Sequence, residues 1–465
     1  MFSMHTISAS NAQAAATHPD WLIKPEDANA LNPKIWPRTA ERIDGMLSIG
    51  GVSVSEAVAE SGSPVYLIDE EDFRARASSF KEAFHGWDVF YAGKAFLSKT
   101  IARWVKEESL NLDVCSMGEI ETALRADFDP AKIGFHGNNK SIDEIRFALE
   151  NGIGRIIVDS FYEISRTEQI AQQLGITANV MVRVTAGVSA HTHDYIATAH
   201  EDQKFGFSIA SGQALVAMIR CHNSAQLNLL GVHSHIGSQI FDTSGFEVAA
   251  KRTLKLLAQF ADATSTQLPE LDLGGGFGIA YTDEDEPATP RSLASDLQGI
   301  VKKQAEILSL DLPRVSIEPG RSIVGPTGVA VYEVGTVKVV DLEEGSRVYV
   351  SVDGGMSDNI RPALYGAEYT AVLASRASDC EPVLCRVVGK HCEGGDIVVH
   401  DVYLPGDIVP GDLIAVPACG AYSYAMASNY NHIPRPPVVS VKAGRLQTMI
   451  RRETLADLAR LDVGE

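Results

Sequence analysis

The feature that most constrains the fold of this chain is an alternation of short apolar segments with longer amphipathic ones. The amphipathic segments carry apolar residues at helical spacing, as at Ile120, Ala123 and Leu124. The apolar segments predict eight strands: Val89–Ala92, Leu110–Cys115, Ile133–His136, Arg155–Asp159, Asn179–Val184, Leu227–His235, Glu270–Leu273 and Arg314–Glu318. Strands that alternate with helices in this way favour a (β/α)8 barrel. A doubly wound open sheet is the alternative, but no GxGxxG motif follows the first strand.

Three consecutive helices share one starting pattern. A serine is followed three residues later by a glutamate in Ser116-Met-Gly-Glu119, Ser141-Ile-Asp-Glu144 and Ser160-Phe-Tyr-Glu163. This spacing predicts capping boxes, in which the serine accepts from the third amide and the glutamate accepts from the serine's own amide.

The sequence changes character after Val324-Gly-Pro326. Segments rich in β-branched residues follow, separated by Gly, Pro and Asp: Val329–Val340, Arg347–Val352, Val383–Val388, Ile397–Leu404 and Leu413–Val416. They predict an all-β domain over residues 326–465, after a barrel over residues 66–325. Residues 1–65 are expected to form an extended arm and a strand that joins the β domain, although the strand near Val65–Ile68 fits either domain.

Composition and charge narrow the possible partners. The chain has 465 residues and a net charge of −20, which disfavours binding to nucleic acid or to an anionic membrane surface. No apolar run approaches the roughly 20 residues of a membrane span, and the N-terminus lacks the pattern of a secretory signal. The cysteines form no CxxC pair, which indicates reduced thiols in a cytoplasmic protein: Cys115, Cys221, Cys380, Cys385, Cys392 and Cys419.

The first predicted barrel strand ends next to a lysine, in Asp88-Val-Phe-Tyr-Ala-Gly-Lys94. If Asp88–Ala92 is a buried strand, Gly93 lets the backbone turn and Lys94 emerges at the mouth of the barrel. A lysine there can form a Schiff base with a carbonyl cofactor, with its pKa lowered by desolvation. The alternative is a solvated lysine that opens a loop.

Two glycine-containing loops follow the seventh and eighth predicted strands, where barrels often bind phosphate. The first contains Gly274, Gly275 and Gly276, and the second contains Gly320 and Arg321. Glycines let backbone amides approach an anion closely, so the two loops predict an anion site. Simple tight turns are the alternative.

The sixth predicted strand leads into His233-Ser-His235-Ile-Gly-Ser238. His235 is placed to lie flat against an aromatic cofactor, and Ser238 to donate to its phosphate. The alternatives are two structural histidines, or a metal site with His191 and His193. No carboxylate or cysteine joins these histidines at ligand spacing, so no metal is predicted.

Glu318 completes a set of residues that together suit a pyridine cofactor. A pyridine cofactor held by Lys94 needs a charged partner on its ring nitrogen, and Glu318 is the predicted partner. Asp113, at the end of the second strand, is expected to support the site. Glu119 can do the same, but its capping role explains it equally well.

Six motifs occur in a recognisable order: Tyr91-Ala-Gly-Lys94, His235-Ile-Gly-Ser238, Gly274–Gly276, Glu318-Pro-Gly-Arg321, His391-Cys392-Glu393 and Gly420-Ala-Tyr422. With them the chain resembles the fold-type III decarboxylases that use pyridoxal 5'-phosphate (PLP), and within these the diaminopimelate decarboxylase branch. The resemblance runs from Tyr66 to Leu458. It implies an alanine racemase-like barrel joined to a β domain, in a head-to-tail homodimer with shared active sites. It also implies decarboxylation of meso-2,6-diaminopimelate to L-lysine.

The resemblance also assigns roles to residues. Lys94 would form the Schiff base, His235 would stack on the ring, and Glu318 would partner the ring nitrogen. Cys392 would come from the other subunit and protonate Cα, a step that the freed Lys94 could perform instead. The alternative for Cys392 is one more buried small apolar residue. The remaining expected cofactor contacts are Asp113, Ser238, Gly274, Gly275, Gly276, Pro319, Gly320, Arg321 and Tyr422.

Charge distinguishes the expected substrate from ornithine, which lacks a distal carboxylate. Arg361 suits a bidentate grip on that carboxylate, and Tyr365 follows it on the same segment. Glu393 can take the distal ammonium, Tyr422 is expected near the substrate, and Arg321 suits either the phosphate or a substrate carboxylate. A surface Arg361 is the alternative.

Two other functions stay open at this point. One is decarboxylation of another basic amino acid or of a carboxylated polyamine. The other is a non-catalytic regulatory homologue, although such a protein would be expected to lose Lys94, Cys392 or the phosphate loops. Two residues depart from the family pattern: Met117, interpreted as a packing residue, and Gly394, which removes a hydroxyl near the distal substrate group.

Overall fold

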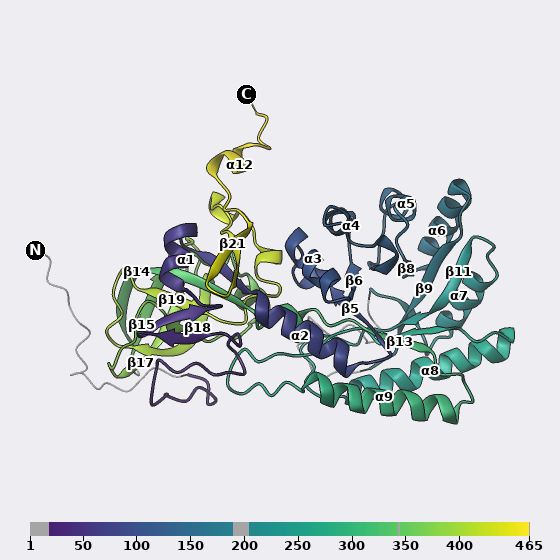
Figure 1. Ribbon diagram of the computed structural model, residues 1–465, viewed down its shortest axis with the longest axis horizontal. Helices are drawn as coiled ribbons and strands as arrows, with labels where there is room; N and C mark the ends of the chain where they lie inside the picture. The colour runs from purple at the N-terminus through teal and green to yellow at the C-terminus, as the bar shows by residue number, and fades with distance from the viewer. Residues whose placement is uncertain (1–17, 189–203, 343–344, 465) are drawn as a thin grey trace, which may run out of the picture. The chain divides into compact units, whose positions relative to one another are not determined.

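Eight parallel strands close into a barrel in the computed structural model of this chain (Figure 1). The structure describes residues 18–188, 204–342 and 345–464. These residues form two compact units. The barrel unit contains residues 74–278 and 286–323, and the β unit contains the described residues up to Phe73, Ile279–Asp285 and those from Val324 on. None of the described helices is long and apolar enough to cross a membrane.

Every predicted barrel strand is present. The strands are β5 (Asp88–Ala92), β6 (Asn111–Val114), β7 (Ile133–Phe135), β8 (Arg155–Val158), β9 (Ala178–Thr185), β11 (Leu227–His233), β12 (Glu270–Asp272) and β13 (Arg314–Ile317). Each pairs in parallel with its neighbours, β13 pairs with β5, and β8 pairs with β9 to close the ring. A short strand, β10 (Phe207–Ser208), pairs with β9. The prediction of a (β/α)8 barrel is therefore confirmed, and the open sheet is excluded.

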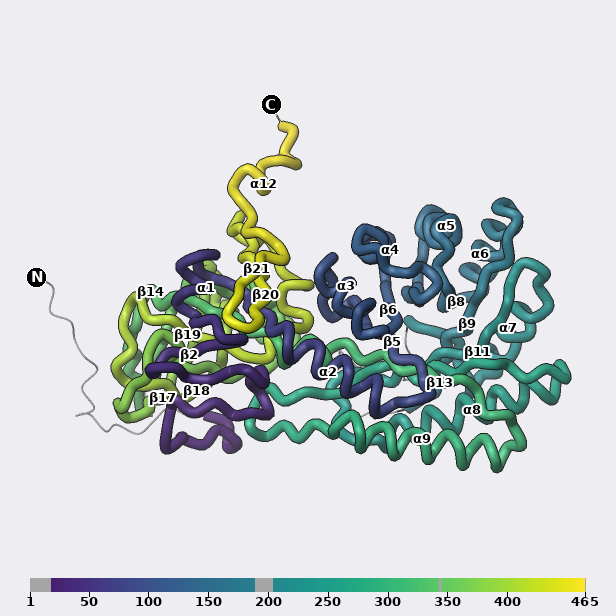
Figure 2. Tube along the Cα trace, in the orientation of Figure 1, coloured from purple at the N-terminus to yellow at the C-terminus, as the bar shows by residue number. Residues whose placement is uncertain are grey.

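Helices surround the barrel because each buries one apolar stripe against it. In α8, for example, Phe246, Leu254 and Phe260 are buried. Figure 2 traces the strand–helix alternation along this unit. The helices are α2 (Glu70–Ala83), α3 (Lys99–Glu107), α4 (Met117–Leu124), α5 (Ile142–Glu150), α6 (Phe161–Leu174), α7 (Gln213–His222), α8 (Ser244–Thr264), α9 (Pro290–Ile307) and α10 (Arg321–Val324), with 3-10 turns η1 (Gly93–Ala95) and η2 (Pro130–Lys132).

Of the three predicted capping boxes, only the one at Ser141 and Glu144 is complete. Ser116 and Ser160 do accept from the third amide of their helices. The Glu119 side chain, however, accepts from the amide of Cys115, one residue further back. The carboxylate of Glu163 instead pairs with Lys140 at 2.6 Å. The prediction was wrong for these two glutamates because each has a partner outside its own helix turn.

The β unit is built on a long sheet with the order β18-β17-β15-β14-β4-β20-β21, while β19 pairs with β14 and β16. Its strands are β4 (Val65–Asp69), β14 (Gly328–Leu342), β15 (Gly345–Val352), β16 (Val372–Leu373), β17 (Pro382–Val388), β18 (Ile397–Pro405), β19 (Leu413–Val416), β20 (Val438–Lys442) and β21 (Arg445–Ile450). All five predicted strands appear. Strand β4, which fitted either domain, pairs with β14 and β20.

The remaining elements of the β unit are short. They are α1 (Val54–Ser61), α11 (Arg361–Tyr365), α12 (Leu455–Ala459), η3 (Tyr424–Met426), η4 (Tyr430–His432) and a small sheet of β1 (Glu41–Ile43), β2 (Met46–Ile49) and β3 (Val52–Ser53). The described part of the N-terminal arm packs on this unit: Ile35 and Trp36 are buried, and Asn29 donates to the Ser378 carbonyl. The three-part division at residues 65 and 325 stays a prediction.

Candidate active site

A cavity of about 290 Å³ lies at the carboxyl ends of the barrel strands. Its walls come mainly from residues at or just after the carboxyl ends of β5, β6, β7, β9, β11 and β13, and Phe205, just before β10, joins them. They are Ala92, Gly93, Lys94, Asp113, Cys115, His136, Gly137, Asn138, Arg183, Phe205, His233, His235 and Glu318. Four of the residues predicted from the sequence, Lys94, Asp113, His235 and Glu318, therefore share one cavity.

Close backbone packing places Lys94 at this cavity. The Ala92 amide donates to the Pro319 carbonyl at 3.2 Å. A Cβ on Gly320 would lie 2.8 Å from that of Ala92, and a Cβ on Gly93 would lie 2.7 Å from the carbonyl oxygen of Asp113. Only glycine fits at these two positions, so the turn after β5 can bring Lys94 against the ends of the neighbouring strands.

Glu318, directly after β13, is buried beside two histidines. Its Oε1 lies 3.0 Å from Nε2 of His233 and 3.4 Å from Nε2 of His136. Burial alone would raise the pKa of this carboxyl, but the two histidines hold it well below its usual range. Within the described part of the chain, no well-oriented hydrogen bond reaches Oε1. The site therefore contains a buried anionic oxygen that can accept a further proton donor.

The other two carboxyls near Glu318 behave in the opposite way. Burial, and then the charge of Glu318, raise the pKa of Asp113 well above its usual range. The same two causes raise the pKa of Asp272 to about 6. Like charges oppose one another's ionisation in a buried site, so the negative charge of Glu318 disfavours the ionised forms of Asp113 and Asp272.

His235 is held as a neutral imidazole. The Gly275 amide donates to its Nδ1 at 3.2 Å, so that nitrogen carries no proton. Burial, followed by the nearby charge of Lys94, lowers the pKa of His235 well below its usual range. A neutral ring with one nitrogen fixed by the backbone is suited to pack against an aromatic ligand.

The two glycine loops lie against each other. Gly274 adopts a φ of 71°, and a Cβ on Gly275 would lie 2.1 Å from the carbonyl oxygen of Glu318. Across this narrow space Arg321 donates to Ser238 Oγ at 2.9 Å. Asp272 orients the first loop by accepting from the Gly274 amide at 2.8 Å. A guanidinium, a hydroxyl and the backbone amides of a glycine loop are groups that bind an anionic phosphate.

These groups fit the expected pyridine cofactor. Oε1 of Glu318 is available to a ring N–H, His235 offers a neutral ring face, and the two glycine loops with Ser238 and Arg321 suit a phosphate. Lys94 lines the same cavity as Glu318 and His235, so a cofactor bound there would have a lysine within the same cavity.

Sequence reasoning did not identify His136, Arg183 and Asp272 as residues of this site, and it assigned His233 no role of its own. Each ends or directly follows a barrel strand, or lies within it in the case of Arg183. That position was the available signal, because strand ends of a barrel carry its active site. His136, His233 and Glu318 can also ligate a metal ion, since their ligand atoms lie within 4.8 Å of one another. The absence of a metal stays a prediction, and His191 and His193 lie outside the described residues.

Five predicted residues lie in the β unit. Arg361 begins α11 and is 5% exposed, so the alternative of a surface arginine is wrong. Its guanidinium donates to the hydroxyl of Tyr369, and no carboxylate contacts it among residues 18–188, 204–342 and 345–464. Tyr365 ends the same helix and is half-buried, as is Tyr422, whose φ is 59°.

Cys392 and Glu393 are exposed on a turn between β17 and β18. Cys392 is thus not the buried apolar residue that was the alternative. The turn is held by Asp396, which accepts from the His391 amide at 2.7 Å and from the Met356 amide at 2.6 Å. One buried carboxylate therefore ties the turn of Cys392 to the segment that precedes Arg361.

The two departures from the family pattern have different surroundings. Met117 is 40% exposed, so it does not pack in the core of the barrel unit. Position 394 is open, because a Cβ there would meet nothing within 4 Å. A serine would fit at that position without strain.

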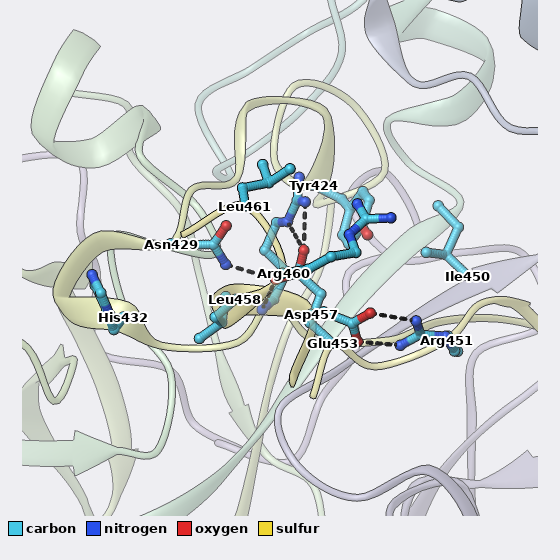
Figure 3. A pocket seen from close by; sticks show the side chains of 11 residues that line it. Tyr424, Asn429, His432, Ile450, Arg451, Glu453, Asp457, Leu458, Arg460 and Leu461 are labelled. Carbon is cyan, nitrogen blue, oxygen red and sulfur yellow. Dashed lines mark hydrogen bonds and ion pairs between the residues drawn. The ribbon is translucent and has the colours of Figure 1, made fainter. Parts of the chain in front are cut away.

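A second cavity, of about 520 Å³, lies in the β unit between residues 424–435, β21 and α12 (Figure 3). Its charged groups largely neutralise one another. Arg451 makes a bidentate pair with Asp457 at 2.6 and 2.7 Å (Figure 3). Arg435 Nε donates to Glu453 at 2.9 Å. The first pair links α12 to the residue that follows β21, and the second joins the segments before β20 and before α12.

Known proteins resemble this chain over most of its length. A family model described as the pyridoxal-binding domain of pyridoxal-dependent decarboxylases matches residues 70–325. Diaminopimelate decarboxylase from Mycobacterium tuberculosis (strain ATCC 25618 / H37Rv) is 50% identical over 440 residues, which cover 93% of this chain and 98% of that protein. The enzyme of the same name from Bacillus subtilis (strain 168) is 47% identical, covering 90% of this chain and 95% of that protein.

Solved structures give the same result. The crystal structure of diaminopimelate decarboxylase from Helicobacter pylori, complexed with L-lysine, has a TM-score of 0.80 at 34% identity and covers 88% of this chain and 98% of that one. The enzyme from M. jannaschii, in complex with L-lysine, has a TM-score of 0.86 at 30% identity and covers 92% of this chain and 98% of that one.

Proposed function

Because the chain belongs to the diaminopimelate decarboxylase family of pyridoxal-dependent enzymes, we propose that it converts meso-2,6-diaminopimelate to L-lysine and carbon dioxide, the last step of lysine biosynthesis. It is a PLP-dependent carboxy-lyase. The observation that supports this substrate is the environment of Arg361, a buried guanidinium whose described partners include no carboxylate. A buried cation without a counter-charge is costly, and a carboxylate on the substrate would supply that charge.

The barrel residues hold the cofactor in this proposal. Lys94 binds it covalently, and Ser238, the loop Gly274–Gly276 and the turn Pro319–Arg321 hold its phosphate. When bound, PLP supplies an electron sink for the bond that breaks between Cα and the leaving carboxylate. Glu318 accepts the ring N–H and keeps it protonated, because His233 and His136 stabilise its carboxylate. His235 packs against the ring, and Tyr422 lies near the phosphate.

The β unit supplies the substrate contacts and the proton. Arg361 and Tyr365 bind the distal carboxylate, Glu393 binds the distal ammonium, and Arg321 serves the phosphate or a substrate carboxylate. The Cys392 thiol delivers a proton to Cα after carbon dioxide leaves. Its exposure on a turn supports this role, because the side chain has to reach a substrate.

The active protein is a homodimer in which Cys392 and Glu393 reach the partner's barrel. Two observations support this. Both residues are exposed on a turn of the β unit. In addition, the amino ends of α4, α5 and α6, on the active-site side of the barrel, expose apolar side chains: Met117, Ile142, Phe161 and Tyr162. Exposed apolar residues at one rim are typical of a surface that another chain covers.

Hybrid dimers test this arrangement. Lys94 lies in the barrel unit and Cys392 lies in the β unit. Lys94→Ala and Cys392→Ala each remove one proposed catalytic group, so each variant alone is inactive or strongly impaired. Mixed and reassociated subunits would regain about a quarter of wild-type activity if Cys392 acts in trans, because half of the dimers then contain one intact site. No recovery in the mixture, with hybrid dimers detected by mass, would contradict a shared site.

We also propose that the protein acts in the cytoplasm. All six cysteines are free thiols in the structure, which supports a reducing compartment.

The direct test of function is carbon dioxide release by the PLP-loaded protein from meso-diaminopimelate, with ornithine and arginine as controls. Release from diaminopimelate alone is expected. Release only from a control would identify a decarboxylase of another basic amino acid. No release from any of the three, with PLP bound, would favour the non-catalytic homologue.

A further inference from the structure

Arg361 lies between two buried tyrosines. The central carbon of its guanidinium is 4.6 Å from the ring centre of Tyr281 and 5.5 Å from that of Tyr369. Nη1 of Arg361 donates to the Tyr369 hydroxyl. The two rings meet edge to face, with centres 5.2 Å apart at 77°. Tyr281 is 5% exposed and Tyr369 is 1% exposed, so both rings contact the guanidinium inside the protein.

Tyr281 comes from an unusual place in the chain. It lies in Ile279–Asp285, which belongs to the β unit although barrel residues precede and follow it. We call this segment the excursion. Asp285 closes it into a turn by accepting from the amides of Tyr281 and Thr282 at 2.8 and 3.0 Å. The excursion starts three residues after Gly276, so it continues directly from the proposed phosphate loop.

Two tyrosine rings, which bring no carboxylate, suit an arginine that has to bind an anion. A long arginine side chain has many rotamers. If the site left this side chain mobile, ordering it when the ligand binds would cost binding free energy. Ring faces and a hydroxyl fix the guanidinium without neutralising it. A carboxylate in their place would fix it too, but would compete with the substrate for the same N–H donors. Burial also keeps Tyr369 neutral, because it raises the pKa of the phenol.

We propose that Tyr281 and Tyr369 are positioning residues that present Arg361 to the distal carboxylate of the substrate, and that the excursion is a specificity element of the enzyme. This inference rests on the proposed function, since it assumes that Arg361 binds that carboxylate. It predicts that loss of either tyrosine contact weakens the binding of ligands that carry the carboxylate and leaves the binding of ligands that lack it unchanged. A purely structural role for the cluster would affect both kinds of ligand equally.

L-Lysine and cadaverine make this distinction, because they share both amines and differ in one carboxylate. Calorimetric titration of each ligand into the PLP-loaded enzyme would compare the wild type with Tyr369→Phe, which removes the hydroxyl, and Tyr281→Leu, which removes the ring. Tyr281→Phe keeps the ring and is the conservative rescue. Tyr349→Phe, on β15 of the same unit, is the matched control.

Tyr369→Phe and Tyr281→Leu are expected to weaken the binding of L-lysine about tenfold and to change the affinity for cadaverine less than about twofold. Their KM for diaminopimelate should rise more than their kcat falls, while Tyr281→Phe and Tyr349→Phe stay near the wild type. Equal weakening of both ligands, or no change for either, would overturn the inference. If Tyr281→Leu does not fold, Tyr369→Phe alone decides it. Failure of wild-type turnover would instead overturn the proposed function.

Discussion

Oε1 of Glu318 lies 3.0 Å from Nε2 of His233 in the interior of the barrel. His233 is the last residue of β11 and Glu318 follows β13, so the two residues come from strands that β12 separates in the barrel. With His136 on the same side, this contact keeps Glu318 ionised although it is buried. The negative charge that a protonated pyridine ring requires is therefore built into the barrel.

Replacing Glu318 by Gln tests this charge. The amide keeps the shape of the side chain but cannot stabilise a protonated ring, so kcat should fall about a hundredfold or more. Steady-state carbon dioxide release measures the effect, and PLP absorbance shows that the cofactor is still bound. Glu144→Gln, in the capping box of α5, is the control and should keep its activity. Unchanged kcat in Glu318→Gln would refute the proposed role.

Lys140 is expected to stabilise the loop after β7. It is 3% exposed and donates to Glu163 and to the carbonyls of Gly137 and Ile157. Lys140→Met leaves a buried carboxylate without its partner, which should cost about 3 kcal/mol. Urea unfolding followed by circular dichroism measures this loss. Lys132→Met, on the exposed surface of the same unit, should change the midpoint little. Equal urea midpoints for Lys140→Met and Lys132→Met would show that the Lys140–Glu163 pair contributes nothing to stability.

Asp396 is expected to act through the turn that carries Cys392. Asp396→Asn replaces one acceptor oxygen by an amide that faces a backbone N–H, so the turn should lose its fixed geometry. We expect kcat to fall about tenfold while PLP binding stays unchanged, because the proposed cofactor residues of the barrel are untouched. Asp379→Asn, an exposed aspartate of the same unit, is the control. Loss of PLP together with kcat would indicate general destabilisation instead.

The C-terminal part of the β unit should loosen in acid. Partial burial alone would raise the pKa of Glu453, but Arg435 and Asn429 lower it to about 2. A carboxyl with a lowered pKa stabilises the fold above its unfolded pKa of about 4.3. That stabilisation is lost progressively as pH falls from there towards 2. Hydrogen exchange of residues 429–461, corrected for intrinsic rates at each pH, measures it. Glu453→Gln should abolish the pH dependence, and its persistence would assign the loosening to other groups.

Much of the fold follows from local sequence patterns. The alternation of strand and helix segments predicted all eight barrel strands, because period and spacing depend on nearby residues alone. Since parallel strands of a barrel end at one face, the same pattern predicted that Lys94, Asp113, His235 and Glu318 would meet. Cys392 and Arg361 were identified only through the resemblance, since neither lies at a strand end of the barrel.

Only the tertiary structure decided which distant side chains become partners. Glu163 pairs with Lys140 rather than with its own helix amide, His233 and His136 join Glu318, and Tyr281 reaches Arg361 from the excursion. Each pair depends on strand register, rotamers and the path of a loop, and none of these is written in local periodicity. The sequence by itself thus determined the order of the elements and the chemistry at their ends. The fold determined which of those groups hold charge, because desolvation and neighbouring charges exist only once the chain is packed.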